Sequence, residues 1–248
     1  MKINNIKNKI KRSKTNKLYI NIFCNALILA MLVSVFTISF SRELETAFTD
    51  VSSAIYRGNT QNNNISLMIN VYGGEEYIPE MLEILEENNV QATFFIGGTW
   101  ADKNADILNM IADAGQEIAN HGYFHKDGDK LSEDGNSKEI SNAESMIFAL
   151  TGIKTTLFAP PSGAYNQATL SACESLGYQT IMWSKDTIDW RDQDVSLIYK
   201  RATTNQQNGD LILMHPTACT VLALEDIIKT TKENGFNLVC VSENIKDI

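Results

Sequence analysis

From residue 65 onward, short apolar runs alternate with amphipathic segments along the chain. The apolar runs are rich in β-branched and aromatic residues, which is typical of buried strands. They span residues 65–71, 92–97, 117–120, 156–159, 180–184, 211–214 and 237–241. Apolar residues at helical spacing predict helices over residues 78–87, 101–114, 137–150, 167–176, 195–206 and 222–233. Several of these segments end at a glycine, the residue preferred just past a helix C-terminus.

Seven strands that alternate with six helices predict a parallel sheet with helices packed outside it. Residues 65–248 are fewer than the ~250 residues typical of an eight-stranded barrel. We therefore expect an α/β fold, a distorted seven-stranded (β/α) barrel, with an open doubly wound sheet as the alternative. No glycine-rich phosphate-binding motif follows the first strand, so the pattern gives no support for nucleotide binding.

The first forty residues have a different pattern. Residues 1–17 hold seven basic residues and no acidic one, and residues 18–40 form an apolar run of 23 residues without a charge. As a helix, this run would reach about 34 Å, enough to cross a ~30 Å hydrocarbon layer. We expect a basic cytoplasmic tail, a transmembrane signal anchor over residues 18–40, a stem over residues 41–64 and a domain over residues 65–248.

A cleaved signal peptide is the alternative to an anchor. The apolar run is longer than a usual signal core of about 7–15 residues, and Ser39-Phe40-Ser41 is a poor cleavage site, which favours the anchor. The basic flank precedes the run, so the tail should stay inside and the domain should lie outside the membrane. In either case we expect the domain to be exported.

The net charge of the chain is positive before the apolar run and negative after it. The formal net charge is −9, yet the chain after the basic tail and apolar run holds 30 acidic and 14 basic residues. A clustered basic face is the mark of a nucleic-acid binder, so nucleic acid is not an expected partner. Three cysteines follow the apolar run without a C-x-x-C motif, which gives no zinc-knuckle or redox signature.

All three histidines follow predicted strands, at the edge where βα folds bind ligands. His121 and His125 follow the third strand, and a spacing of four residues can place two imidazoles on the same side, as a metal pair requires. His215 ends the sixth strand and is a candidate general acid or base. The alternative interpretation is that His121 and His125 are turn histidines bonded to the backbone and that His215 is a hydrogen-bonded histidine at a strand end.

Two more strand ends carry polar or aromatic residues. The fourth runs into a stiff turn with Pro161, Ser162 and Tyr165, and the fifth runs into a segment with Asp186 and Trp190. Asp186 and Asp189 are both available to orient an imidazole. Taken alone, Asp189 is better explained as a solvated loop residue or helix cap.

Together, these motifs resemble the polysaccharide deacetylases of the NodB-homology type, carbohydrate esterase family four. The resemblance is carried by A-T-F-F-I-G, N-H-x-x-x-H, the P-P-x-G turn, D-x-x-D-W and L-x-L-M-H, in that order between residues 65 and 215. It implies a distorted seven-stranded βα barrel that removes acetyl groups from glycans with the help of a divalent metal.

The resemblance also implies roles for individual residues. His121 and His125 would be metal ligands, with zinc the expected metal and cobalt or manganese the alternatives. His215 would be the general acid, tuned by Asp186. The substrate-binding set would comprise Tyr72, Pro161, Ser162, Tyr165 and Trp190.

The chain departs from the family pattern at two places. The family motif T-F-D-D-G supplies two carboxylates after the first strand, and we align Tyr72 and Gly73 with them. The family arginine of the R-P-P turn is replaced by Ala159. The loss of the carboxylates and the loss of the arginine are physically linked, because an arginine without its carboxylate would be an unpaired charge in a closed site. A third metal ligand would come from Glu75, Glu76 or water.

The sequence therefore predicts a membrane-anchored, extracytoplasmic deacetylase-like hydrolase that acts on a cell-envelope glycan such as peptidoglycan or a chitin-like oligosaccharide. The alternative is a catalytically impaired protein of the same fold that binds glycan or acts in envelope or spore assembly. A serine hydrolase is disfavoured, because no G-x-S-x-G motif is present.

Overall fold

The structure is a computed structural model that describes residues 25, 27–35 and 53–248. It divides into two compact units, Met1–Val51 and Ser52–Ile248. Residues 25 and 27–35 are helical, and no helix within the described residues is long and apolar enough to cross a membrane. Most of the predicted anchor, all of the basic tail and part of the stem lie outside the described residues, so the anchor stays a prediction.

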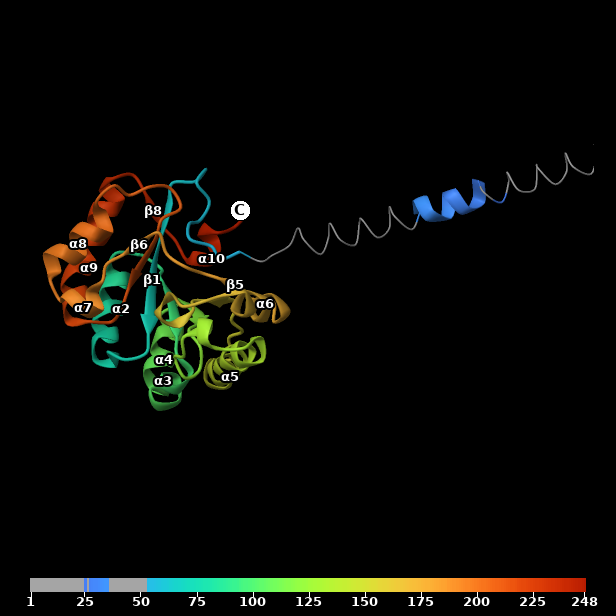
Figure 1. Cartoon of the computed structure of the whole chain (residues 1–248). Helices are drawn as coiled ribbons and strands as arrows, with labels where there is room; N and C mark the ends of the chain where they lie inside the picture. The colour runs from blue at the N-terminus through green and yellow to red at the C-terminus, as the bar shows by residue number, and fades with distance from the viewer. Residues whose placement is uncertain (1–24, 26, 36–52) are drawn as a thin grey trace, which may run out of the picture. The chain divides into compact units, whose positions relative to one another are not determined.

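The second unit is built on a parallel sheet of eight strands (Figure 1). The strands are β1 (Asn64–Val71), β2 (Thr93–Ile96), β3 (Glu117–Asn120), β4 (Leu157–Phe158), β5 (Gln179–Thr180), β6 (Lys185–Asp186), β7 (Leu211–Met214) and β8 (Asn237–Leu238). Seven of them follow the order β5-β4-β3-β2-β1-β7-β6, and β8 pairs with the start of β1. Among the described residues, no pairing joins β5 to β6, so the barrel is open there.

Helices follow most strands and pack around the sheet (Figure 1). They are α2 (Ile78–Glu87), α3 (Gly98–Lys103), α4 (Ala105–Asp113), α5 (Glu133–Thr151), α6 (Gln167–Ser175), α7 (Asp189–Asp192), α8 (Val195–Thr203), α9 (Ala218–Glu233) and α10 (Val241–Asn244). Short 3-10 turns lie at Glu75–Tyr77, Gly128–Lys130 and Pro161–Gly163. The arrangement is the open α/β barrel that the alternating pattern predicts.

Two apolar layers cover the two faces of the sheet. Because neighbouring residues of a strand point to opposite faces, Ile69 packs in the large cluster between the sheet and the helices, whereas Met68 packs inside the barrel. Phe95 and Ala119 join Met68 in the inner cluster. Both faces of β1 are therefore buried, which explains its near-continuous apolar sequence.

The sheet has one strand more than the seven predicted, because two short strands, β5 and β6, stand in place of the single strand predicted over residues 180–184. The segment predicted as one helix over residues 101–114 is two helices, because Asn104 leaves helical geometry and its side-chain Nδ2 donates to the carbonyl of Trp100. The helix predicted to begin at residue 137 begins at Glu133, with Ser132 as its N-cap. The short elements β6 and α7 are too brief for a hydrophobic period to indicate them.

A buried ion pair closes the amino-terminal end of the barrel. Asp210 precedes β7, its side chain is fully buried, and its Oδ1 lies 2.6 Å from Nη1 of Arg57. The same carboxylate accepts hydrogen bonds from the Ser184 hydroxyl at 2.7 Å and from the backbone N–H of Gln207 at 2.8 Å. Arg57 thereby attaches the segment before β1 to the start of β7.

We expect Asp210→Ala to lower the free energy of unfolding by about 3 kcal/mol, because it leaves Arg57 and Ser184 without their shared acceptor. Urea denaturation of the full chain in detergent, followed by circular dichroism, measures the change. Asp113→Ala, at an exposed carboxylate of α4, is the control and should change stability by less than about 0.5 kcal/mol. Equal stability of the two variants would contradict this role for Asp210.

Candidate functional site

A cavity of about 690 Å³ lies at the carboxyl ends of the strands. Side chains that follow β1, β3 and β7 converge there because the strands are parallel and share one edge. The lining residues are Asn70, Tyr72, Gly73, His121, His125, Ser162, Trp183, Asp186, Trp190, Leu213, His215 and Pro216. All three histidines of the chain are therefore in one cavity.

His121 and His125 lie beside each other, with ring centroids 5.0 Å apart. The Nδ1 of His121 lies 2.8 Å from the carbonyl oxygen of Ala159, which can only accept, so the proton is on Nδ1. Burial, with repulsion from His125, lowers the pKa of His121 to about 3 against the opposing effect of that hydrogen bond. Burial also lowers the pKa of His125 below its ordinary value of 6.5.

Tyr72 covers His125. Their ring centroids lie 4.4 Å apart at an interplanar angle of 32°. The Tyr72 hydroxyl accepts a hydrogen bond from Thr99 at 3.1 Å and donates to the carbonyl of Phe124 at 3.3 Å. Gly97 makes room for the ring, since a Cβ there would lie 2.6 Å from Cδ2 of Tyr72. Tyr72 thus joins the end of β1 to the loop that carries His125.

His125 itself has a left-handed backbone, with φ of 55°. This conformation is uncommon for a residue with a side chain, and such residues gather at functional sites. The contact with Tyr72 and the hydrogen bond from Tyr72 to Phe124 hold the loop in this form.

His215 is held by a buried carboxylate, and that carboxylate is Asp189. The Asp189 Oδ1 lies 2.7 Å from Nδ1 of His215, and its Oδ2 accepts from the His215 amide at 2.6 Å and from the Thr220 hydroxyl at 2.6 Å. Burial opposes ionisation of Asp189, but these bonds and the proximity of His215 outweigh it and hold the pKa of the carboxyl below 3.8. The Nε2 of His215 is left for the cavity.

This geometry corrects two predictions. Asp186 was expected to tune His215, whereas its Oδ1 accepts from the Ile188 amide at 2.8 Å while the residue lines the cavity. Asp189 was interpreted as a solvated loop residue or helix cap, whereas it is fully buried. The turn from β6 into α7 explains why Asp189, and not Asp186, contacts His215. It directs Asp189, the first residue of α7, inward to the imidazole.

The predicted substrate-binding residues separate into two groups. Tyr72, Ser162 and Trp190 line the cavity, whereas Pro161 and Tyr165 do not. Pro161 is buried, and the Tyr165 hydroxyl lies 2.8 Å from that of Tyr56. The 3-10 turn explains the difference, because Ser162 adopts φ of 57° within it and its neighbours face elsewhere.

Asn70 is the lining residue that the sequence reasoning missed. It is the second-last residue of β1, is 4% exposed, and its Oδ1 is buried without a hydrogen-bond partner. Tyr72 and Gly73, which we aligned with the family carboxylates, follow the end of the strand. A polar residue within an apolar strand was the available signal, since strand alternation places Asn70 on the inner face with Met68.

The donor set does not fit a tightly held divalent metal. Among the described residues, no three His, Cys, Asp or Glu side chains come together in a way that could hold a metal ion. Glu75, a suggested third ligand, accepts a hydrogen bond from Nε1 of Trp100, and neither it nor Glu76 lines the cavity. Two imidazoles alone lack the third protein ligand that zinc sites of enzymes have.

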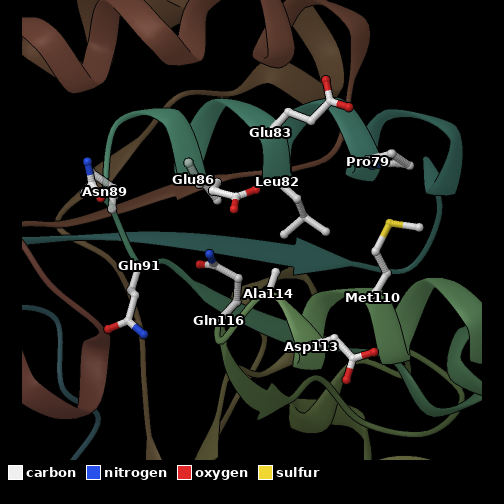
Figure 2. Close-up of a pocket in the computed structure, with 12 residues that line it drawn as sticks. Pro79, Leu82, Glu83, Glu86, Asn89, Gln91, Met110, Asp113, Ala114 and Gln116 are labelled. Atoms are coloured by element: carbon white, nitrogen blue, oxygen red, sulfur yellow. The ribbon is translucent and has the colours of Figure 1, made fainter.

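A second hollow of about 660 Å³ lies between α2 and α4 (Figure 2). Leu82 and Met110 point toward it, and the carboxylates of Glu83, Glu86 and Asp113 surround it. It adjoins Gln116, next to the start of β3, at the opposite end of the strands from the histidines. None of the predicted site residues lies in it.

Comparisons with known proteins agree with the resemblance found in the sequence. The sequence model of the polysaccharide deacetylase family matches residues 57–181. A peptidoglycan-N-acetylglucosamine deacetylase of Bacillus cereus is 30% identical over 176 residues, which cover 68% of this chain and 82% of that protein. The uncharacterized protein YlxY of Bacillus subtilis is 38% identical over 189 residues, which cover 76% of this chain but only 59% of YlxY.

Solved structures of similar proteins include one without activity. A CE4 family pseudoenzyme from Bacillus anthracis is 37% identical, superposes with a TM-score of 0.77, and the match covers 79% of this chain and 70% of that one. A mutant of that pseudoenzyme with restored enzymatic activity is 35% identical, with a TM-score of 0.77 and coverage of 79% and 72%. This fold is thus known with and without catalysis.

The buried position of Asp189 gives a pH prediction. Its pKa in the folded state is below 3.8, so the carboxylate stabilises the fold above about pH 4, and this contribution is lost as the pH falls through the folded pKa. We expect Asp189→Asn to lower the free energy of unfolding at neutral pH by about 2 kcal/mol and to flatten its decline below pH 4.

Chemical denaturation at a series of pH values measures this change. Asp102→Asn, at an exposed carboxylate of α3, is the control and should follow the original protein. An acid decline in Asp189→Asn as steep as in the original protein would contradict the assignment.

The two imidazoles of His121 and His125, taken as metal ligands, give a second prediction. After dialysis against micromolar zinc and then metal-free buffer, we expect the chain to retain well under one equivalent of zinc, because two imidazoles hold the ion weakly. A chelator should then leave the melting temperature unchanged. Metal analysis and thermal denaturation test this, and a full equivalent of zinc that His121→Ala abolishes would overturn it.

Proposed function

Because the chain belongs to the polysaccharide deacetylase family, we propose that it binds an acetylated cell-envelope glycan in the histidine cavity and does not hydrolyse it efficiently. The observation that carries this proposal is Asn70. Asn70, the second-last residue of β1, lines the cavity with a neutral amide, which is not a carboxylate. An amide cannot take a proton from water and is a poorer ligand for a divalent metal than a carboxylate.

Acetyl hydrolysis requires an activated water and a group that stabilises the oxygen charge of the tetrahedral state. His121 is kept neutral, and its Nδ1 donates to Ala159. Tyr72 packs against the ring of His125. These contacts suit a fixed wall for a bound ligand. Within the part of the chain that the structure describes, no carboxylate joins the two imidazoles in a group that could hold a metal ion.

Glycan recognition is supported by the aromatic side chains of the cavity. Trp183 and Trp190 line it together with Tyr72, and Trp190 is 59% exposed. Exposed aromatic faces give apolar area to the flat side of a sugar ring while their edges remain wet. The Bacillus cereus relative acts on N-acetylglucosamine of peptidoglycan, and we propose the same class of glycan as the ligand here.

An active deacetylase is the second candidate, because the pair of His215 and Asp189 is complete. A buried carboxylate that fixes Nδ1 of an imidazole and leaves Nε2 free is the arrangement of a general acid or base. In this reading His215 would protonate the departing amine, and a carboxylate or a metal would have to be supplied to activate water.

We also propose that the domain lies outside the cytoplasmic membrane. The basic tail followed by 23 uncharged residues favours export and retention at the membrane. This location gives the cavity access to the glycan of the envelope.

For the full chain in detergent, we expect calorimetry to detect binding of the N-acetylglucosamine tetramer, and an acetate assay to detect no release above a protein-free control. Trp190→Ala should weaken binding about fivefold, because aromatic stacking contributes on the order of 1 kcal/mol. Leu222→Ala, at an exposed apolar residue of α9, is the control. Acetate release that disappears in His215→Ala would support the active enzyme and contradict the proposal.

A further inference from the structure

The side-chain amide of Asn70 lacks a partner although it is almost fully buried. The residue is 4% exposed, its Oδ1 is enclosed without a hydrogen-bond partner, and its Nδ2 donates to no described residue. A buried polar group without a partner costs about 1–3 kcal/mol of stability. Because Asn70 lines the cavity, a bound ligand can supply an acceptor to the Nδ2 end of the amide.

The sheet register places this amide on the floor of the cavity. Asn70 is opposite Phe95 on β2, and Phe95 is opposite Ala119 on β3. On the other side, Ile69 is opposite Met214, so Asn70 is level with His215. Phe95 and Ala119 are apolar, and therefore Asn70 and His215 are the polar groups of this layer.

The unpaired hydrogen-bond donor of the Asn70 amide points to a neutral acceptor on the ligand. The Oδ1 is enclosed, so the amide can reach a ligand through its Nδ2, which is a donor. An anionic acceptor is disfavoured because Asp186 lines the same cavity and Asp189 lies behind His215. On an amino-sugar glycan, the neutral acceptor that most differs from a hydroxyl is the carbonyl oxygen of the acetamido group.

We propose that Asn70 donates a hydrogen bond from Nδ2 to the acetamido carbonyl oxygen of a bound glycan and so selects N-acetylated sugars. This inference rests on the proposed glycan binding. This role requires an amide, because a carboxylate at position 70 would offer only acceptors to the carbonyl. Asn70 is then a specificity-determining residue and holds the acetyl group intact.

The test compares two neutral tetrasaccharides of equal length, the N-acetylglucosamine tetramer and cellotetraose, on the full chain in detergent. Cellotetraose has a hydroxyl where the other has the acetamido group, and neither carries charge that the acidic chain could attract. Calorimetry should show about tenfold tighter binding of the acetylated tetramer, as expected for one added neutral hydrogen bond.

Substitutions of Asn70 separate the effect of the hydrogen-bond donor from the effect of side-chain size. Asn70→Leu removes the amide, and Asn70→Asp keeps its size and removes the donor. Both should weaken binding of the acetylated tetramer about tenfold and leave the affinity for cellotetraose unchanged. Asn70→Ala replaces Asn70→Leu if circular dichroism shows that the latter is unfolded. Asn62→Leu, at an exposed residue before β1, is the matched control and should keep the preference.

The outcomes distinguish this inference from the function on which it rests. If the original protein binds neither tetramer, the proposed function fails and the inference fails with it. If the original protein binds both equally, or if the Asn70 variants keep the preference for the acetylated tetramer, glycan binding stands and the role of Asn70 is overturned.

Discussion

Strand β1 pairs in parallel with β2 on one edge and with β7 on the other, and the cavity depends on that pairing. The register makes Asn70 level with His215 and one layer deeper than His121, so three side chains distant in sequence share one cavity. Parallel strands deliver their carboxyl ends to a single edge, and the helices outside keep that edge rigid. The buried contact between Arg57 and Asp210 secures the other end of β1 and β7.

The carboxylates and imidazoles of the cavity are arranged differently from those that hydrolysis at a metal site needs. The carboxylate of Asp189 contacts His215 and also accepts hydrogen bonds from Thr220 and the Trp190 amide. His121 contacts the Ala159 carbonyl, and His125 packs against the Tyr72 ring. The contact between His215 and Asp189 suits the general acid or base of the second candidate function, whereas the proposed binding function needs no group that activates water. Binding of an acetylated glycan is compatible with all of these contacts.

Much of the fold could be predicted from the sequence, because apolar runs and helical periods are local signals. The strands at residues 117–120 and 211–214 and the helix at residues 78–87 have the predicted bounds. The shared position of the three histidines also followed from strand ends alone. The identity of the carboxylate under His215 could not be predicted, since Asp186 and Asp189 differ only in how the chain turns between β6 and α7. Asn70 carried a visible signal, a polar residue inside an apolar strand, and its importance depends on contacts that sequence does not give.

One nuclear magnetic resonance experiment tests the central claim most directly. Saturation transfer from the full chain to the acetyl methyl groups of the N-acetylglucosamine tetramer reports contact with the cavity, and the same sample reports free acetate over time. We predict transfer to the acetyl methyl groups that Trp190→Ala reduces, with no growth of the acetate signal over that of the ligand alone. Steady accumulation of acetate that requires His215 would contradict the account and show an active deacetylase.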